Sequence, residues 1–440
     1  MRQYLSAAVK IAAFLLALSA CSKIENEPIA DEPAKGTCKM FFEGRVAGYD
    51  NTVLRDGIST KAASSWQDGD KVYIVFYKGT EIVVGEAQYS VADGWTITFD
   101  GDLSEGKSLK CEVRFFVNPT FANAYTVNLN PHSEIYEDVN AEYDYTGGNL
   151  RVSASLVPKV GRIRFTGNDG EMIFISGIET YSNYAPATNS FSSTKGMFRE
   201  TIGSDGSTVY IYGFCSYADR KVGVVGSDCA YTKYFAESIF KQGESGYMAI
   251  PTTSAHNGWK SGFYVTLGDV EFKMIAVPGY EGGFYLIGET EVTNAIYNMS
   301  SSVSNPMTPK SFSYSSDCTS YISRINYATN LNFYVPDLSE WQFAAKGGVH
   351  SQGYTYSGSD NPNDVAWYYG NSGNALHPVK QLAPNELGLY DMSGNISEWI
   401  NENGNWSLCG GDYRSYEKDI TVTSNGFFYQ YGLRLALKCE

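Results

Sequence analysis

Runs of alternating apolar and polar residues fill the first half of the chain, from about residue 38 to residue 251. In the run 71–77, the side chains of Val72, Ile74 and Phe76 fall on one face, and a Lys-Gly turn follows. A period of two residues predicts β-strands that bury one face. The 34 tyrosines and 44 glycines among 440 residues also suit short strands joined by tight turns. We therefore expect this half to be all-β.

A second series of such runs occupies residues 156–165, 209–213 and 222–225. A chain of 440 residues has room for two or three domains. Two β-sandwich-like domains fit the two series better than one domain does. We place them at residues 38–150 and 151–267.

The pattern changes near Gly268. Residues 270–277 form one more strand-like run, and helical periodicity follows at 294–297 and at 319–327. A mixture of this kind predicts an α+β domain, which we place at residues 268–440.

The N-terminus reads as an export signal rather than as part of the fold. Arg2 and Lys10 flank the start of an apolar run, residues 11–20, which is too short to span a bilayer as a helix. The run ends in Leu-Ser-Ala-Cys, which resembles the lipobox of bacterial lipoproteins and implies that Cys21 carries the lipid. The alternative is a plain secretory signal that happens to end at a cysteine.

This assignment has consequences for location. Residues 1–20 would be the signal peptide, and residues 21–37, rich in Glu, Asn and Pro, would be a flexible tether that buries no core. We expect an outer membrane lipoprotein exposed at the cell surface. The net charge of -15 and the pI of about 4.8 would repel phosphate backbones, so nucleic acid is not an expected partner.

Seven further cysteines are scattered along the chain without a Cys-x-x-Cys spacing, so they predict no zinc site. An exported protein can form disulfides, and Cys215 with Cys229 is the pair that a hairpin would close most easily. Buried free thiols are the alternative.

The all-β half resembles the fimbrillin-like lipoproteins of Bacteroidales. The resemblance rests on a Trp-x-x-Gly-Asp turn at residues 66–70, the Gly-Trp pair at 94–95, Phe115 with Phe116, and the run 156–165. It implies two transthyretin-like β-sandwiches, and it implies a pilus subunit or a related surface lipoprotein that accepts a donor strand from a fimbrial neighbour. A stalk that only holds the next domain away from the membrane is the alternative.

The last third resembles the formylglycine-generating enzyme and sulfatase-modifying-factor group, whose fold is related to C-type lectins. The matching segments occur in the family's order: residues 335–348, 356–360, 365–368, 384–399, 410–411 and 432–435. Within 384–399, turn-forming residues alternate with large apolar ones, so this stretch must thread a compact core and needs internal pinning. Asp391 and Glu398 are the carboxylates best placed to pin it, and Glu340 is expected to cap or brace a helix.

The resemblance implies a structural calcium site at the carboxylates of Asp391 and Glu398 and at the backbone of Gly394 and Ile396. The alternative has Asp391 capping a turn and Glu398 forming a buried hydrogen bond, without a metal. A second calcium site of the family is degraded, because Val365 stands where an asparagine ligand is expected.

The family's catalysis needs two thiolates close together after the Gly-Gly turn, because soft sulfur ligands hold Cu(I). Cys409 precedes this turn and Cys439 follows the final strand, so neither matches. The iron-dependent relatives need clustered histidines, whereas His132, His256, His350 and His377 are solitary in the sequence. We expect no copper, no iron and no catalytic residue. A metal-dependent oxidoreductase with an unconventional site is the alternative.

Aromatic and polar residues crowd the last strands and loops, a composition that recognises ligands at low entropy cost. The candidate ligand-binding residues are Trp406, Tyr413, Arg414, Tyr416, Tyr429 and Tyr431. The alternative is that some of these rings belong to the core of the last sheet. We expect an adhesin or pilus tip subunit with a lectin-like head that binds a surface glycan or protein of the host or of another bacterium. A structural pilus anchoring subunit is the further alternative.

Overall fold

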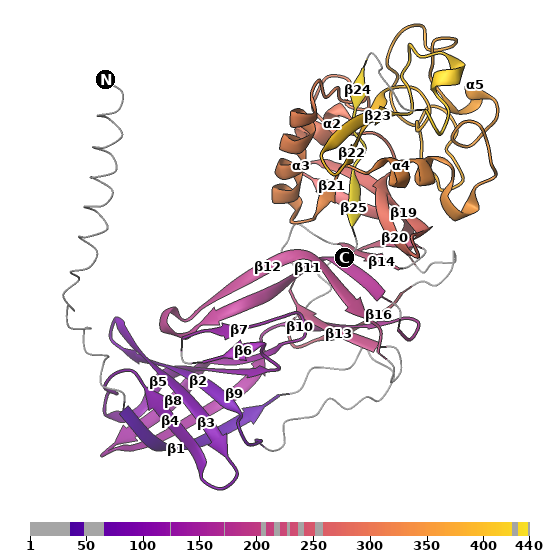
Figure 1. Ribbon diagram of the computed structural model, residues 1–440. Coiled ribbons are helices and arrows are strands. Elements are labelled where there is room, and N and C mark those ends of the chain that lie inside the picture. The colour runs from indigo at the N-terminus through magenta and orange to yellow at the C-terminus, as the bar shows by residue number, and fades with distance from the viewer. Residues whose placement is uncertain are drawn as a thin grey trace, which may run out of the picture.

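The computed structural model describes residues 36–47, 66–123, 125–170, 172–203, 208–214, 221–226, 229–235, 242–250, 258–424 and 430–438. Strands far outnumber helices in these residues (Figure 1). The predicted signal peptide, the lipid-bearing Cys21 and most of the predicted tether lie outside the described residues. Within the described ranges, no helix combines the length and apolar character needed to cross a bilayer.

The first domain is a closed barrel with the strand order β1-β4-β3-β2-β5-β8-β9. The expectation was a transthyretin-like β-sandwich. In the structure the sheet closes into a barrel, because β1 pairs antiparallel with β4 and parallel with β9. The predicted domain limit at residue 150 falls inside β9, whose inward side chains complete the barrel core. The strands are β1 (Gly36–Val46), β2 (Lys71–Lys78), β3 (Glu81–Ser90), β4 (Gly94–Phe99), β5 (Gly106–Val117), β8 (Glu134–Thr146) and β9 (Asn149–Pro158).

The Trp-x-x-Gly-Asp segment is a turn that leads into β2, as its sequence predicts. Gly69 has a φ of +89°, and the backbone N–H of Gln67 donates to the Asp70 carboxylate over 2.7 Å. The Trp66 ring packs edge-on against Trp95 and Phe115, with 5.0 Å between ring centroids in each case. The turn therefore fixes an aromatic side chain against the barrel core.

The second domain contains two sheets that share one apolar core. One sheet has the order β13-β10-β16, and the other has the order β17-β15-β14-β11-β7-β6, with β12 paired to β11. The strands are β6 (Phe121–Ala122), β7 (Val127–Asn128), β10 (Gly161–Thr166), β11 (Met172–Ala185), β12 (Ser190–Thr201), β13 (Thr208–Gly213), β14 (Lys221–Val225), β15 (Ala230–Tyr234), β16 (Ser245–Ala249) and β17 (Trp259–Ser261); the turn η1 (Pro186–Thr188) joins β11 to β12.

The C-terminal domain combines short helices with two small sheets, of order β18-β19-β20-β25-β21 and β23-β22-β24. The predicted limit at residue 268 falls in the turn between β18 and β19, so β18 belongs to this domain. Its elements are β18 (Phe263–Leu267), β19 (Val270–Tyr280), β20 (Gly283–Gly288), α2 (Asn294–Asn298), α3 (Ser315–Thr329), β21 (Phe333–Tyr334), α4 (Leu338–Ala345), η2 (Gly348–His350), α5 (Pro362–Val365), β22 (Ser397–Glu402), β23 (Asn405–Cys409), η3 (Glu417–Asp419), β24 (Tyr431–Gly432) and β25 (Ala436–Lys438).

Helix α4 shows how the local sequence sets these elements. Asp337 is its N-cap, and the Asp337 carboxylate accepts from the Glu340 N–H while the Glu340 carboxylate accepts from the Asp337 N–H. This reciprocal capping box satisfies two backbone donors at the helix start. The expectation that Glu340 caps a helix is confirmed.

The second and C-terminal domains share part of their core. Phe174 of β11 and Val225 of β14 belong to the same buried cluster as Phe263 and Leu286 of the C-terminal sheet. The Phe174 ring meets the Phe284 ring edge-on at 5.7 Å. In Figure 1 the C-terminal domain stands on the second domain, on the side away from the barrel. The two domains are therefore joined by side-chain packing as well as by the chain.

Candidate functional site

The segment predicted to need pinning, residues 384–399, is held by buried polar contacts. Asn395 has a positive φ of 57° and is fully buried. Its backbone N–H donates to the Trp367 carbonyl over 2.8 Å, and its amide donates to Glu291 over 3.1 Å and accepts from the His377 N–H. The loop is thus fixed from two sides before β22 begins.

A buried charge cluster lies at the centre of the domain. Arg434 is 0% exposed, and its guanidinium donates to both Glu398 oxygens, the shortest contact being 2.6 Å. The same guanidinium donates to the carbonyls of Gly288 and Tyr390 over 2.9 and 2.8 Å. The Trp341 indole Nε1 donates to Glu398 over 2.6 Å. Glu398 therefore has donors on both oxygens. The ion pair of Arg434 and Glu398 joins the segment before β25 and the segment 390–398 to the end of β20 and to α4.

Two further carboxyl groups complete the cluster. Burial raises the pKa of Glu291 well above its ordinary value, and the Asp391 charge raises it further. The Arg434 guanidinium lies 3.8 Å from the Glu291 Oε2. Burial also raises the pKa of Asp391 to about 6, although the backbone N–H of Lys380 donates to that carboxylate. When the pH rises above the ordinary glutamate range, Glu291 loses its proton in the unfolded chain but keeps it in the folded chain. This group therefore makes the free energy of unfolding fall as the pH rises.

The two carboxylates expected to hold calcium already have hydrogen-bond donors in the structure. Glu398 is saturated by Arg434 and Trp341, and Asp391 accepts from a backbone N–H. In the described residues, no group of three His, Cys, Asp or Glu side chains is arranged to hold a metal ion. The positive charge that a hard cation would bring is already supplied by the Arg434 guanidinium. Calcium binding stays a prediction, and this ion pair argues against it.

Removal of divalent cations gives a direct test. We expect excess EDTA or added calcium to leave the thermal unfolding midpoint of the purified protein unchanged within about 1 °C, because a structural metal at high occupancy would add several kcal/mol of stability. Differential scanning calorimetry measures the midpoint. A clear drop with EDTA that calcium, but not magnesium, reverses would establish the calcium site after all.

The thiols of the C-terminal domain are buried and separate. Cys409 ends β23 and packs with Trp341, whereas Cys318 lies on α3 in a different apolar cluster. Desolvation raises the pKa of each thiol to about 12, so both stay protonated at neutral pH and are poor ligands and nucleophiles. Cys439 and Cys215 lie outside the described residues.

The described histidines are also separate from one another. His132 pairs with Glu200 in the second domain at 2.9 Å, and His350 lies in η2. The His377 ring stacks on Trp367, with 3.7 Å between centroids. His256 lies outside the described residues. No two of the three described histidines share a site.

The predicted ligand-binding residues divide into two groups. Trp406 and Tyr431 are half-buried around Trp399, at 6.0 and 5.5 Å from its ring. Arg414 and Tyr416 are exposed on the loop before η3. Tyr429 lies outside the described residues. Among the described residues, Trp406 and Tyr431 thus share a contact with Trp399, whereas Arg414 and Tyr416 lie on another loop.

Tyr413 is buried, unlike its neighbours Arg414 and Tyr416. It is only 4% exposed, and its ring lies under the Arg414 guanidinium at 5.0 Å. Residue 413 thus faces inward, whereas residues 414 and 416 face outward. The role of Tyr413 in ligand binding stays a prediction.

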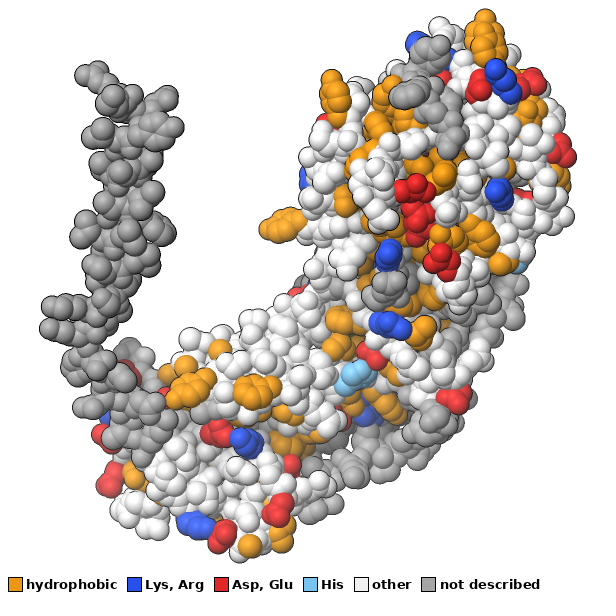
Figure 2. All heavy atoms as spheres, viewed as in Figure 1, with side chains coloured by type: hydrophobic (Ala, Val, Ile, Leu, Met, Phe, Trp, Pro, Cys, Tyr) orange, Lys and Arg blue, Asp and Glu red, His pale blue; other side chains and the backbone are white. Residues whose placement is uncertain are grey.

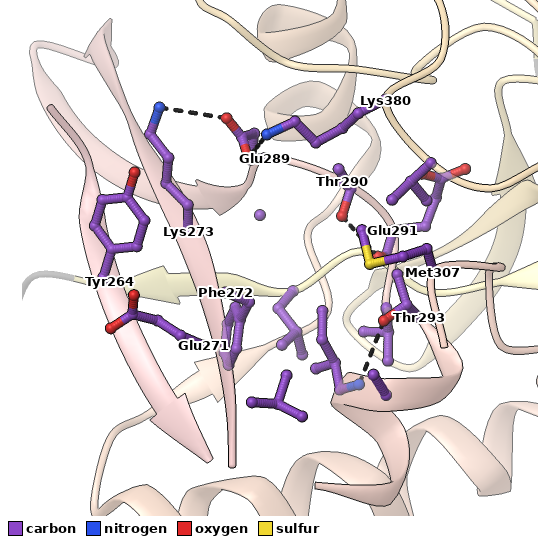
Figure 3. A pocket seen from close by; sticks show the side chains of 17 residues that line it. Tyr264, Glu271, Phe272, Lys273, Glu289, Thr290, Glu291, Thr293, Met307 and Lys380 are labelled. Atoms are coloured by element: carbon purple, nitrogen blue, oxygen red, sulfur yellow. Dashed lines mark hydrogen bonds and ion pairs between the residues drawn. The ribbon is translucent and has the colours of Figure 1, made fainter. Parts of the chain in front are cut away.

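A cavity of about 230 Å³ lies beside the charge cluster, between β18, β19, the turn after β20 and the start of α2 (Figure 3). Glu289 is bridged at its rim by the ammonium groups of Lys273 and Lys380, at 3.3 and 2.7 Å. The Thr290 hydroxyl donates to a backbone carbonyl, and the Thr293 hydroxyl caps α2. Both hydroxyls are thus used in hydrogen bonds to the backbone.

Sequence reasoning missed Glu291 and Arg434. Both carry charges within apolar runs, Leu-Ile-Gly-Glu-Thr-Glu-Val and Leu-Arg-Leu, and a charge in a buried strand is a signal for a paired partner.

Comparison with known proteins agrees with the C-terminal fold. Residues 283–434 match the family model described as the sulfatase-modifying factor enzyme 1-like domain. The chaperone protein LppX of Paenibacillus barcinonensis is 42% identical over 135 residues, covering 25% of this chain and 48% of that protein. The inactive C-alpha-formylglycine-generating enzyme 2 of Bos taurus is 33% identical over 98 residues, covering 20% of this chain and 30% of that protein.

The chain spans less than half the length of these two curated relatives. Among solved structures, a fimbrial protein from Bacteroides ovatus covers 92% of this chain and 99% of its own, at 9% identity and a TM-score of 0.24. The C-terminal part thus carries a domain of the sulfatase-modifying-factor type.

Proposed function

We propose that the chain is a surface lipoprotein whose C-terminal domain binds a ligand and performs no cysteine oxidation. The observation that carries this proposal is the state of the thiols. Cys409 is fully buried with a pKa raised to about 12, and Cys318 lies in a separate core. Copper-dependent oxidation needs two accessible thiolates beside each other. The buried cluster around Arg434 serves to hold the fold rather than to react.

The remaining parts of the chain support a role in which the C-terminal domain is held away from the membrane and exposed to a ligand. Cys21 would carry the lipid, the barrel and the second domain would form a stalk, and the C-terminal domain would be the distal head. Fimbrial and adhesin proteins are among the solved structures similar to this chain, and one relative of the head is named as inactive. An adhesin or pilus tip subunit agrees with this order of parts.

A binding screen tests the proposal. Purified full-length protein, applied to arrays of glycans and of surface proteins, is expected to bind a defined subset of spots. In parallel, copper-loaded protein incubated with a cysteine-containing sulfatase peptide is expected to form no aldehyde, as measured by mass spectrometry.

Two outcomes would replace the proposal. Aldehyde formation with stoichiometric copper would establish the oxidoreductase alternative. An absence of array binding, together with strand-exchange complexes with a fimbrial subunit, would favour the structural pilus subunit instead.

A further inference from the structure

Two tyrosine rings stand exposed side by side on the loops near α5 and η3. The side chain of Tyr369 is 62% exposed and that of Tyr416 is 60% exposed, and their ring centroids lie 5.1 Å apart with the planes inclined at 50°. Figure 2 shows hydrophobic side chains projecting from the surface of the C-terminal domain. Single exposed aromatic residues are common on protein surfaces, but a pair in mutual contact is a preformed feature.

The backbone beneath the two rings is fixed. The Tyr369 N–H donates to the Ser415 carbonyl over 3.0 Å, which ties the two loops together. The Ser372 hydroxyl donates to the Tyr413 carbonyl over 2.7 Å. Because these bonds exist before any ligand arrives, the rings lose little conformational freedom on binding.

Asp412 reinforces the same loop from below. Its side chain is fully buried, and it accepts from the N–H groups of Arg414 and Gln430 over 2.8 and 3.0 Å. A buried carboxylate with backbone donors on both oxygens holds the chain direction at this turn. The side chain of Tyr416, four residues after Asp412, therefore projects from a backbone that is held in place.

Polar groups lie on the residues next to the two tyrosines in sequence, Tyr368 and Glu417, and on Arg414. The Arg414 Nε donates to the Asn374 side-chain oxygen over 3.0 Å. The Tyr368 hydroxyl donates to Glu417 over 3.2 Å, and the Asn363 amide oxygen lies 3.4 Å from that hydroxyl. Guanidinium, amide and carboxylate groups on the same loops can present both donors and acceptors to ligand hydroxyls.

Resting on the ligand-binding role proposed above, we propose that the Tyr369 and Tyr416 pair is a stacking site for consecutive pyranose units of a neutral glycan. The apolar face of a sugar ring packs on an aromatic face, and its hydroxyls meet the polar groups of the same loops. Two rings inclined at 50° suit adjacent sugar units, whose planes are rotated about the glycosidic bond. A net charge of -15 disfavours a polyanionic ligand. A surface of two rings gives weak single-site binding, and many copies on one membrane would raise the avidity.

The test uses the full chain and a panel of neutral oligosaccharides: cellotetraose, mannotetraose, xylotetraose and a poly-N-acetyllactosamine tetrasaccharide. Saturation-transfer NMR and isothermal titration measure binding. Tyr369→Ala with Tyr416→Ala is expected to weaken binding of the recognised glycan at least tenfold, whereas the corresponding pair of Phe substitutions keeps most of the affinity because the rings remain.

Matched controls separate stacking from folding. Tyr314→Ala with Tyr327→Ala removes two rings that are also exposed, at and within α3, and is expected to leave the affinity unchanged. All variants should keep the wild-type unfolding midpoint, since every replaced ring is exposed. Undiminished binding by Tyr369→Ala with Tyr416→Ala would overturn the site while leaving a ligand-binding head intact. Binding only to polypeptides would overturn the glycan assignment, and binding to nothing on any array would remove the proposed function itself.

Discussion

Arg434→Met will destabilise the C-terminal domain by about 3–5 kcal/mol, because it leaves Glu398 as a buried charge without its partner. The guanidinium also satisfies the carbonyls of Gly288 and Tyr390, which a thioether cannot do. Urea unfolding followed by hydrogen exchange at β20 and β22 measures the loss in this domain separately from the barrel.

Two companion variants make this result specific. Arg414→Met removes an exposed guanidinium and is expected to change stability by about 0.5 kcal/mol or less. Arg434→Met combined with Glu398→Gln removes both charges and retains an acceptor for Trp341, so it should recover more than half of the loss. If the double variant is as unstable as the single one, the unpaired charge is not the cause.

Trp341→Ala will lower the free energy of unfolding of the C-terminal domain by a similar amount, about 3–5 kcal/mol, for a different reason. The Trp341 ring is fully buried between α4 and the second small sheet, and its indole donates to Glu398. Truncation of the ring leaves a cavity, and it removes one of the hydrogen-bond donors to the Glu398 carboxylate. Trp341→Phe keeps much of the packing and should lose clearly less.

The comparison variant for Trp341 is Trp406→Ala. Trp406 is half-buried on β23, so its truncation should cost about 1 kcal/mol or less. Chemical denaturation of the three variants under one condition gives the ranking. Equal losses for Trp341→Ala and Trp406→Ala would mean that burial does not decide the effect.

Local pattern was sufficient to predict individual elements. The alternation in residues 71–77 corresponds to β2, the run 270–277 lies within β19, and the helical period at 319–327 lies within α3. These predictions are confirmed, because side-chain periodicity is set by neighbours only a few residues apart.

Long-range pairing was not predictable in the same way. Barrel closure depends on β1 finding both β4 and β9, and no local signal states which strands will pair. The candidate site shows the same limit. Asp391 and Glu398 were correctly identified as pinning carboxylates, but the partner Arg434 comes from a distant strand end.

The aromatic contact between Phe174 and Phe284 has a mechanical consequence. The ring of β11 is embedded in the same apolar cluster as the C-terminal sheet, so the junction resists bending as packed side chains do and does not swivel as a bare linker would. Tension applied to the C-terminal domain would therefore pass through this packed junction into β11 and into its hydrogen-bonded neighbours β12 and β14.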